Sequence, residues 1–196
     1  MSNETILNFS NISIDDSPFR HFSSVSALNG GLDKELFKWF EETDKWGYTE
    51  TDFYTQYEFS LFDTDIPVPL ECLLDRSFII AIENEFKKVY NSSSLELVGV
   101  TAHKLVDGYK MGVHNDFIGE QETHRFLIQI NSNWQENNGG YLMLFNSTNA
   151  DDVSKIILPL NNTGFGFEIS PKSYHAVSTV YDFCRYTLVY TFKTVK

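Results

Sequence analysis

Residues 108–117 read Gly-Tyr-Lys-Met-Gly-Val-His-Asn-Asp-Phe, and this stretch carries the pattern that decides the fold. Asp107-Gly108 is a strong turn signal, and the residues after it predict an extended segment. His114 and Asp116 are two residues apart, so on an extended segment both side chains leave from the same face. A second imidazole, His175, follows much later in the chain on another predicted strand. These three side chains are therefore candidates for one metal site.

The candidate ligands are two imidazoles and one carboxylate. This set binds non-haem Fe(II) and leaves coordination positions open for other ligands. A structural zinc site is the competing interpretation, but it closes four positions with Cys or His at short spacings, which are missing here. His-x-Asp alone arises often by chance, and each residue could be an ordinary surface or core residue. The ordered set of His114, Asp116, His175 and then Arg185 favours the Fe(II) site.

The sequence of the C-terminal half of the chain predicts short strands separated by turns. Apolar, aromatic and β-branched segments predict strands over 95–105, 109–113, 125–131, 141–145, 155–158, 164–169, 174–178 and 185–193. Before them, apolar stripes at helical spacing predict helices over 32–46 and 73–90. This order indicates an α+β, mainly β fold, an antiparallel sandwich or barrel with the N-terminal helices packed on one sheet. We expect one domain over 1–196, with helical support over about 1–94 and the strand-rich core over about 95–196.

Composition limits the partners and the location of the protein. The 196 residues carry a formal net charge of −12 and include two cysteines, Cys72 and Cys184. An acidic surface repels phosphate backbones, so we expect no nucleic-acid substrate. Met1 to Asp16 lacks the pattern of a signal peptide, and no apolar run is long enough for a membrane span, so we expect a cytoplasmic protein without membrane contact. Two cysteines exclude a disulfide framework. The sequence gives no basis for an oligomeric state.

Several motifs occur in the order found in a known enzyme family. Residues 108–117, the strand 125–131 with Trp134, Gly139-Gly140, residues 173–177 and residues 185–188 together resemble the prolyl-4-hydroxylase-like group of 2-oxoglutarate/Fe(II) oxygenases. The resemblance implies a double-stranded β-helix (jelly-roll) core, Fe(II) at His114, Asp116 and His175, and 2-oxoglutarate and O₂ as cosubstrates. It also implies hydroxylation of an unactivated C–H bond in an amino-acid side chain, within a peptide, a protein or a natural-product precursor, or as a free amino acid. Desaturation and cyclisation remain open.

The same resemblance assigns the cosubstrate end of the site. The family's basic residue, which matches Arg185, binds the C5 carboxylate of 2-oxoglutarate, and Thr187 on the same strand face adds a hydrogen bond. Family members often place a tyrosine at one of two positions, which here hold Met111 and Gln129. Gln129 can donate its amide hydrogen to the same carboxylate, although a core glutamine satisfied by the backbone is the commoner case.

Other residues have weaker claims to a function. Tyr54, Tyr57, Trp134 and Arg125 could shape a substrate pocket, although packing or surface display explains each more simply. The acidic and aromatic stretch over 44–65 admits a cationic or peptide substrate, with a solvated acidic surface as the simpler explanation. The other histidines, His21, His103 and His124, have no assigned role, and the pair His124-Arg125 lies near the metal loop without ligand spacing. A hypothesis of another class is a non-catalytic, cupin-like jelly roll that binds or senses through its metal, which the intact set of four site residues disfavours.

Overall fold

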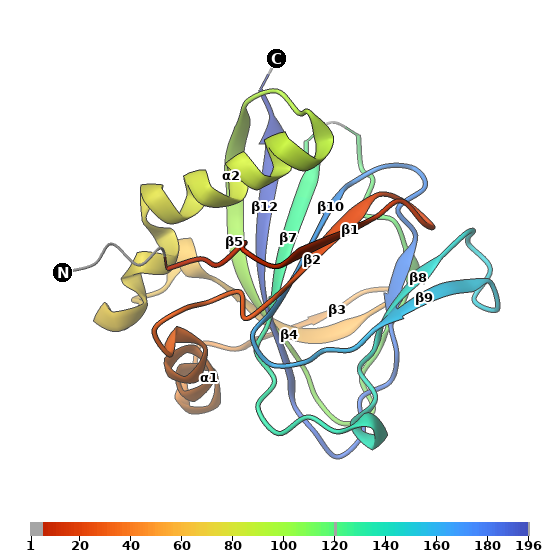
Figure 1. The fold of residues 1–196 in the computed structure, drawn as a ribbon. Coiled ribbons are helices and arrows are strands. Elements are labelled where there is room, and N and C mark those ends of the chain that lie inside the picture. Colours follow the sequence, from red (N-terminus) through yellow and green to blue (C-terminus); the bar gives the residue numbers. More distant parts are fainter. Residues whose placement is uncertain (1–5, 120, 196) are drawn as a thin grey trace.

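The computed structural model describes residues 6–119 and 121–195. Two antiparallel sheets face each other and form a double-stranded β-helix (Figure 1). The large sheet has eight strands in the order β1 (Ile12–Asp15), β2 (His21–Val25), β10 (Thr163–Glu168), β7 (His124–Gln129), β12 (Arg185–Thr194), β5 (Leu95–Leu105), β4 (Thr55–Ser60) and β3 (Gly47–Glu50). The small sheet has four strands in the order β6 (Met111–His114), β11 (His175–Val177), β8 (Leu142–Phe145) and β9 (Val153–Ile157). The predicted fold class is confirmed.

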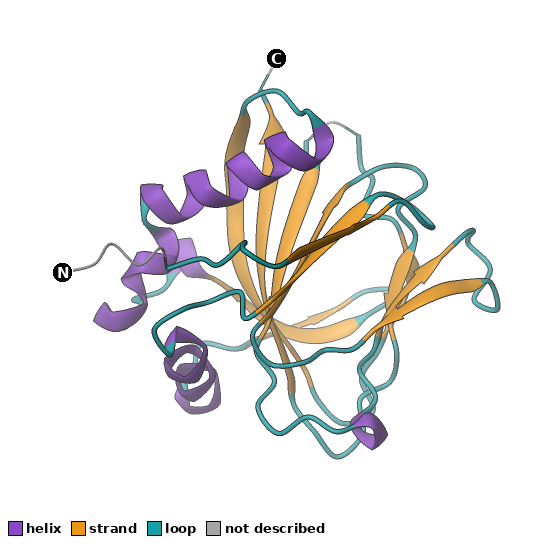
Figure 2. Cartoon of the chain, in the orientation of Figure 1, coloured by secondary structure: helices purple, strands orange, loops and turns teal. Residues whose placement is uncertain are grey.

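Two helices cover the outer face of the large sheet, as Figure 2 shows. They are α1 (Leu32–Glu42) and α2 (Arg76–Tyr90), and short 3₁₀ turns lie at Leu61–Asp63, Val68–Leu74 and Glu136–Asn138. Both helices are shorter than predicted. Helix α1 ends before Trp46 because Thr43 is extended, and the Trp46 indole turns back to donate to the Phe40 carbonyl at 3.0 Å. Helix α2 begins only after Asp75, whose backbone is extended.

Strict alternation along β12 and β7 gives the large sheet two different faces. Outward residues such as Phe126 and Tyr190 join the buried core under the helices, where Phe86 of α2 packs against the sheet. Inward residues are more polar and include the buried side chains of Gln129 and Thr187. The helices therefore bury one face of the sheet, and the other face remains available to line a cavity.

The N-terminal part of the chain contributes more than helical support. Strands β1 and β2 extend one edge of the large sheet, and β3 and β4 extend the other. Strand β2 pairs with β10, where the Phe22 ring lies so close to Gly166 that a Cβ there would sit 2.2 Å from the ring. The two halves of the chain thus share one sheet. Within the described residues, no helix has the length and apolar character needed to cross a membrane.

Candidate active site

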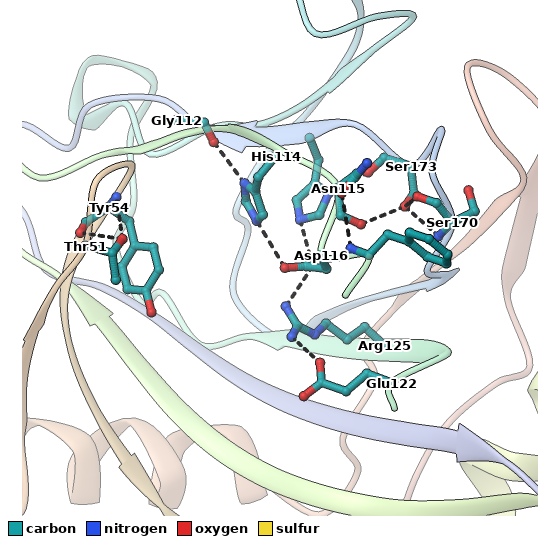
Figure 3. Close-up of polar contacts among 12 residues, drawn as sticks. Thr51, Tyr54, Gly112, His114, Asn115, Asp116, Glu122, Arg125, Ser170 and Ser173 are labelled. Carbon is teal, nitrogen blue, oxygen red and sulfur yellow. Dashed lines mark hydrogen bonds and ion pairs between the residues drawn. The ribbon is translucent and has the colours of Figure 1, made fainter. Parts of the chain in front are cut away.

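The three predicted metal ligands meet between the two sheets. His114 at the end of β6 lies directly opposite His175 at the start of β11, and their rings are 4.2 Å apart between centroids. The Asp116 carboxylate lies between them, with Oδ1 3.3 Å from His114 Nε2 and Oδ2 3.2 Å from His175 Nε2 (Figure 3). Each residue offers one ligand atom, and these three atoms lie within 4.8 Å of one another. This compact arrangement can hold a single metal ion.

The prediction that 114–116 is extended was wrong at its last residue. Strand β6 ends at His114, and Asp116 has a φ of 58°, in the left-handed region. Aspartate tolerates this conformation better than most residues. The turn brings the carboxylate back toward both imidazoles. The side chains therefore meet through a turn and not through strand alternation.

Hydrogen bonds fix both imidazoles in the state that a metal requires. His114 Nδ1 lies 2.9 Å from the Gly112 carbonyl oxygen, and His175 Nδ1 lies 2.8 Å from that of Ser173. A carbonyl only accepts, so each Nδ1 carries the proton and each Nε2 presents its lone pair. Both lone pairs face the Asp116 carboxylate, an arrangement that is repulsive unless a cation lies among them. The donor set therefore fits Fe(II).

Arg125 on β7 supplies a positive charge next to Asp116. One guanidinium nitrogen lies 2.7 Å from Asp116 Oδ2, and another lies 2.8 Å from Glu122 Oε2. Burial opposes ionisation of Asp116, but nearby positive charge, that of Arg125 foremost, outweighs it and holds the pKa of the carboxyl well below its usual range. Burial lowers the pKa of His175. Asp116 is thus ionised and His175 neutral, as metal ligation demands.

Arg185 provides a buried cation at the other end of the site. Only 5% of this residue is exposed, and burial lowers its pKa to about 10. Its Nε donates to the Gly140 carbonyl at 2.9 Å, and another guanidinium nitrogen donates to Thr187 Oγ1 at 2.8 Å. No acidic side chain in the described ranges forms an ion pair with it. A buried cation without a counter-ion is costly, so this position fits the carboxylate of a bound ligand.

Gln129 completes a chain of hydrogen bonds that starts at Arg185. The Thr187 hydroxyl accepts from Arg185 and therefore donates to Gln129 Oε1, at 3.1 Å. Gln129 Nε2 is buried and has no hydrogen-bond partner among the described residues. Its donor hydrogens are consequently free for an anion beside Arg185. The backbone-satisfied core glutamine considered from the sequence is not what is observed.

One cavity joins these groups. His114 and His175 line it together with Arg185 and Thr187, and much of the remaining wall is apolar: Leu105, Met111, Leu127, Leu142, Phe167, Val177 and Val189. The metal ligands and the buried cation therefore open onto the same enclosed space. An elongated dianion could reach both ends of it.

The structure adds two residues that the sequence did not assign to the site, since the cavity wall includes His103 of β5 and Gln56 of β4. Arg125, for which packing or surface display is the simpler explanation from the sequence, contacts Asp116 and lines the same cavity. The only signal in the sequence was alternation, since His103 shares its strand face with Leu105. Trp134 instead donates from its indole to the Gly139 carbonyl at 2.8 Å and supports the glycine turn.

A jelly roll with a His-Asp-His centre and an inward-facing arginine defines the class of non-haem Fe(II) enzymes that use 2-oxoglutarate. Residues 100–192 match the 2OG-Fe(II) oxygenase superfamily, and this segment contains every residue of the site predicted from the sequence. The chain is therefore a 2-oxoglutarate- and Fe(II)-dependent dioxygenase whose cosubstrate is O₂. No curated protein shows significant sequence similarity to it.

Solved structures share the fold at low sequence identity. A Pseudomonas putida prolyl-4-hydroxylase is 14% identical, with a TM-score of 0.72 over 90% of this chain and 93% of that one. A Trichoplax adhaerens prolyl hydroxylase in complex with a hypoxia inducible factor peptide fragment is 13% identical, with a TM-score of 0.74 over 89% of this chain and 83% of that one. HygX from Streptomyces hygroscopicus, with nickel and 2-oxoglutarate bound, is 9% identical, with a TM-score of 0.63 over 89% and 83%. At these identities the likeness concerns the fold.

Proposed function

We propose that this oxygenase hydroxylates an unactivated C–H bond of an amino-acid side chain in a peptide, a protein or a natural-product precursor. The observation that carries the proposal is the shared cavity, which is lined by both histidines of the His-Asp-His centre and by a buried arginine that forms no ion pair with the described residues. The substrate class is supported by the relatives in fold, which include prolyl hydroxylases, one of them bound to a peptide, and HygX bound to hygromycin B.

In this proposal the metal is held by His114, Asp116 and His175. Fe(II) bound there would activate O₂ and couple substrate oxidation to the decarboxylation of 2-oxoglutarate to succinate and CO₂. Gly112 and Ser173 keep the two imidazoles in the ligating tautomer through their carbonyl oxygens. The protein would thus supply three ligands and leave other coordination positions to the cosubstrate.

The C5 carboxylate of 2-oxoglutarate would bind at the other end of the cavity. Arg185 offers charge-assisted hydrogen bonds, and the free amide hydrogens of Gln129 lie one hydrogen bond further along the same chain. Thr187 orients both groups because its hydroxyl accepts from one and donates to the other. The apolar walls exclude water and strengthen these interactions.

A cytoplasmic location is part of the proposal. Both cysteines, Cys72 and Cys184, are free thiols, as a reducing compartment favours. Fractionation of cells that express the untagged chain tests this point, and recovery in an oxidising compartment would contradict it.

The test of the activity is 2-oxoglutarate turnover to succinate under air with added Fe(II). We expect slow turnover by the wild type even without a substrate, and none by His114→Ala or Arg185→Ala. A peptide and metabolite screen for the mass gain of one oxygen atom then tests the substrate class. Failure to bind both Fe(II) and 2-oxoglutarate would overturn the proposal and favour a non-catalytic jelly roll.

A further inference from the structure

Strand β4 turns a set of polar side chains toward the active site. Gln56 and Glu58 alternate with outward residues, and Glu58 lies directly opposite His103 of β5 in the register. Tyr54 precedes the strand, forms a bridge to Met111 and lies across from Arg125 in Figure 3. These residues come from the N-terminal half of the chain, and they form a wall that neither the metal ligands nor the cosubstrate residues use.

Glu58 is a carboxylate held by two hydrogen bonds, and the described residues provide no lysine or arginine as its counter-ion. The Thr49 hydroxyl donates to its Oε1 at 2.9 Å, and the Gln56 amide donates to its Oε2 at 2.6 Å. The side chain is 30% exposed, and no lysine or arginine of the described residues forms an ion pair with it. His103 Nε2 lies 3.8 Å away, but burial, Arg125 and Arg185 lower the pKa of His103 to about 3, so this imidazole is neutral.

Gln56 adds a buried acceptor to the same wall. Only 2% of the residue is exposed, its Oε1 has no hydrogen-bond partner among the residues described, and the side chain lines the cavity. Its orientation is set by Glu58, because a flipped amide would place an oxygen against the carboxylate. A buried carbonyl oxygen without a donor is costly, which points to a donor supplied by a ligand.

Two other charged side chains, Arg125 and Arg185, line the same cavity as Gln56. Arg125 is engaged by Asp116 and Glu122, so its positive charge is neutralised. Arg185 lies at the cosubstrate end. At the wall itself, Glu58 is a carboxylate that no lysine or arginine of the described residues pairs with, and its sign calls for a cation.

We propose that the wall formed by Gln56 and Glu58 binds a protonated nitrogen of the substrate, an ammonium or a guanidinium group. This inference rests on the proposed function and narrows its substrate to a basic amino-acid side chain or amine. The Glu58 carboxylate supplies the charge, and Gln56 Oε1 supplies a neutral acceptor. The arrangement disfavours a substrate that ends in a carboxylate at this wall.

The test compares matched substrates that differ only in charge. Lysine is paired with norleucine and arginine with citrulline, each as the free amino acid and at the centre of a blocked glycine-rich pentapeptide. We expect the basic member of at least one pair to stimulate succinate formation and to gain one oxygen atom, with kcat/KM about tenfold or more above its neutral partner. If no basic probe exceeds its partner, including the case in which neither reacts, the inference is overturned.

Glu58→Gln gives the second arm, with Glu96→Gln as its control. Glu96 is an exposed residue at the far end of β5, so both variants remove one negative charge. We expect Glu58→Gln to lose the preference for the basic probe and Glu96→Gln to keep it. A general folding defect would lower both members of a pair equally, so the ratio isolates the charge contact. An unchanged ratio in Glu58→Gln would refute the inference.

The proposed function and the inference about Glu58 can be disproved separately. Turnover of 2-oxoglutarate by the wild type, dependent on His114, reports on the proposed function without any substrate. If that turnover and the binding of Fe(II) and 2-oxoglutarate are both absent, the proposed function fails. If they are present and the basic probes show no advantage, only the inference about Glu58 fails.

Discussion

The Nε atom of Arg185 donates a hydrogen bond to the carbonyl oxygen of Gly140 at 2.9 Å. Gly140 has a φ of 68°, and a Cβ added to it would lie 2.9 Å from Arg185 Cδ and 3.3 Å from a methyl group of Val180. The glycine turn therefore does two things: it adopts a conformation that disfavours side chains, and it leaves room for the arginine to lie against it.

Gly140→Ala is expected to weaken 2-oxoglutarate binding about tenfold or more, because the new methyl group displaces the guanidinium. Gly108→Ala is the matched control, since Gly108 also has positive φ but nothing within 4 Å of its added Cβ. Both variants should lose about 1–2 kcal/mol of unfolding free energy from backbone strain. Titration with 2-oxoglutarate should separate them, and equal affinities would show that the Gly140 contact does not position Arg185.

Replacing the buried arginine should separate stability from ligand binding. Arg185→Met removes a cation that has no counter-ion in the described protein, so the ligand-free variant should unfold at a temperature no lower than the wild type. It should also lose about 2–5 kcal/mol of 2-oxoglutarate binding free energy. Thermal unfolding with Ni(II), with and without 2-oxoglutarate, measures both effects. A strongly destabilised ligand-free variant would indicate that Arg185 is a structural residue.

Much of the core could be predicted because its strands alternate strictly. In β12 the outward positions Tyr186 and Leu188 are apolar and buried, while Arg185 and Thr187 point inward, as their spacing predicted. Such a pattern depends only on local sequence and on one buried face. The order of the metal-binding motifs along the chain, which resembles that of a known family, predicted the topology of the sheets.

Other features could not be read from a local pattern. The positive φ of Asp116 concerns a single residue. It changes the direction of the backbone there but leaves the pattern of apolar and polar residues unchanged, so that pattern cannot predict it. The Gln56 and Glu58 wall depends on β4 pairing with β5, a long-range contact whose register the sequence does not display. The sequence does not reveal the ion pair between Arg125 and Asp116. Asp116 lies outside the strand that carries Arg125, and the two meet only because the arginine side chain is long.

Arg125 should control the affinity for the metal through Asp116. Arg125→Gln removes the group that holds Asp116 Oδ2 at 2.7 Å, and loss of such a supporting contact typically lowers metal affinity about 10–100-fold. Direct repulsion between Arg125 and Fe(II) is small because Glu122 neutralises the guanidinium. Anaerobic titration of the metal-free protein with Fe(II) measures the effect. Arg76→Gln, an exposed change of the same charge on α2, should bind as the wild type does, and equal affinity in both variants would contradict the role of Arg125.

His124 should make the stability of the protein depend on pH. Burial lowers its pKa from 6.5 to about 4, and its ring packs against Phe86 and Tyr90. As pH falls below 6.5, the unfolded chain takes up a proton that the folded chain refuses until about pH 4, so stability falls between these values and then levels off.

The share of His124 in this loss is about 1.4 kcal/mol for each pH unit, or about 3 kcal/mol across the window. Other histidines with a lowered pKa, such as His103, add their own share, so the comparison is between the wild type and His124→Gln. Urea unfolding at several pH values between 7 and 4 should give a shallower loss of stability in His124→Gln than in the wild type. Parallel curves for the two proteins would mean that His124 is already protonated in the folded state.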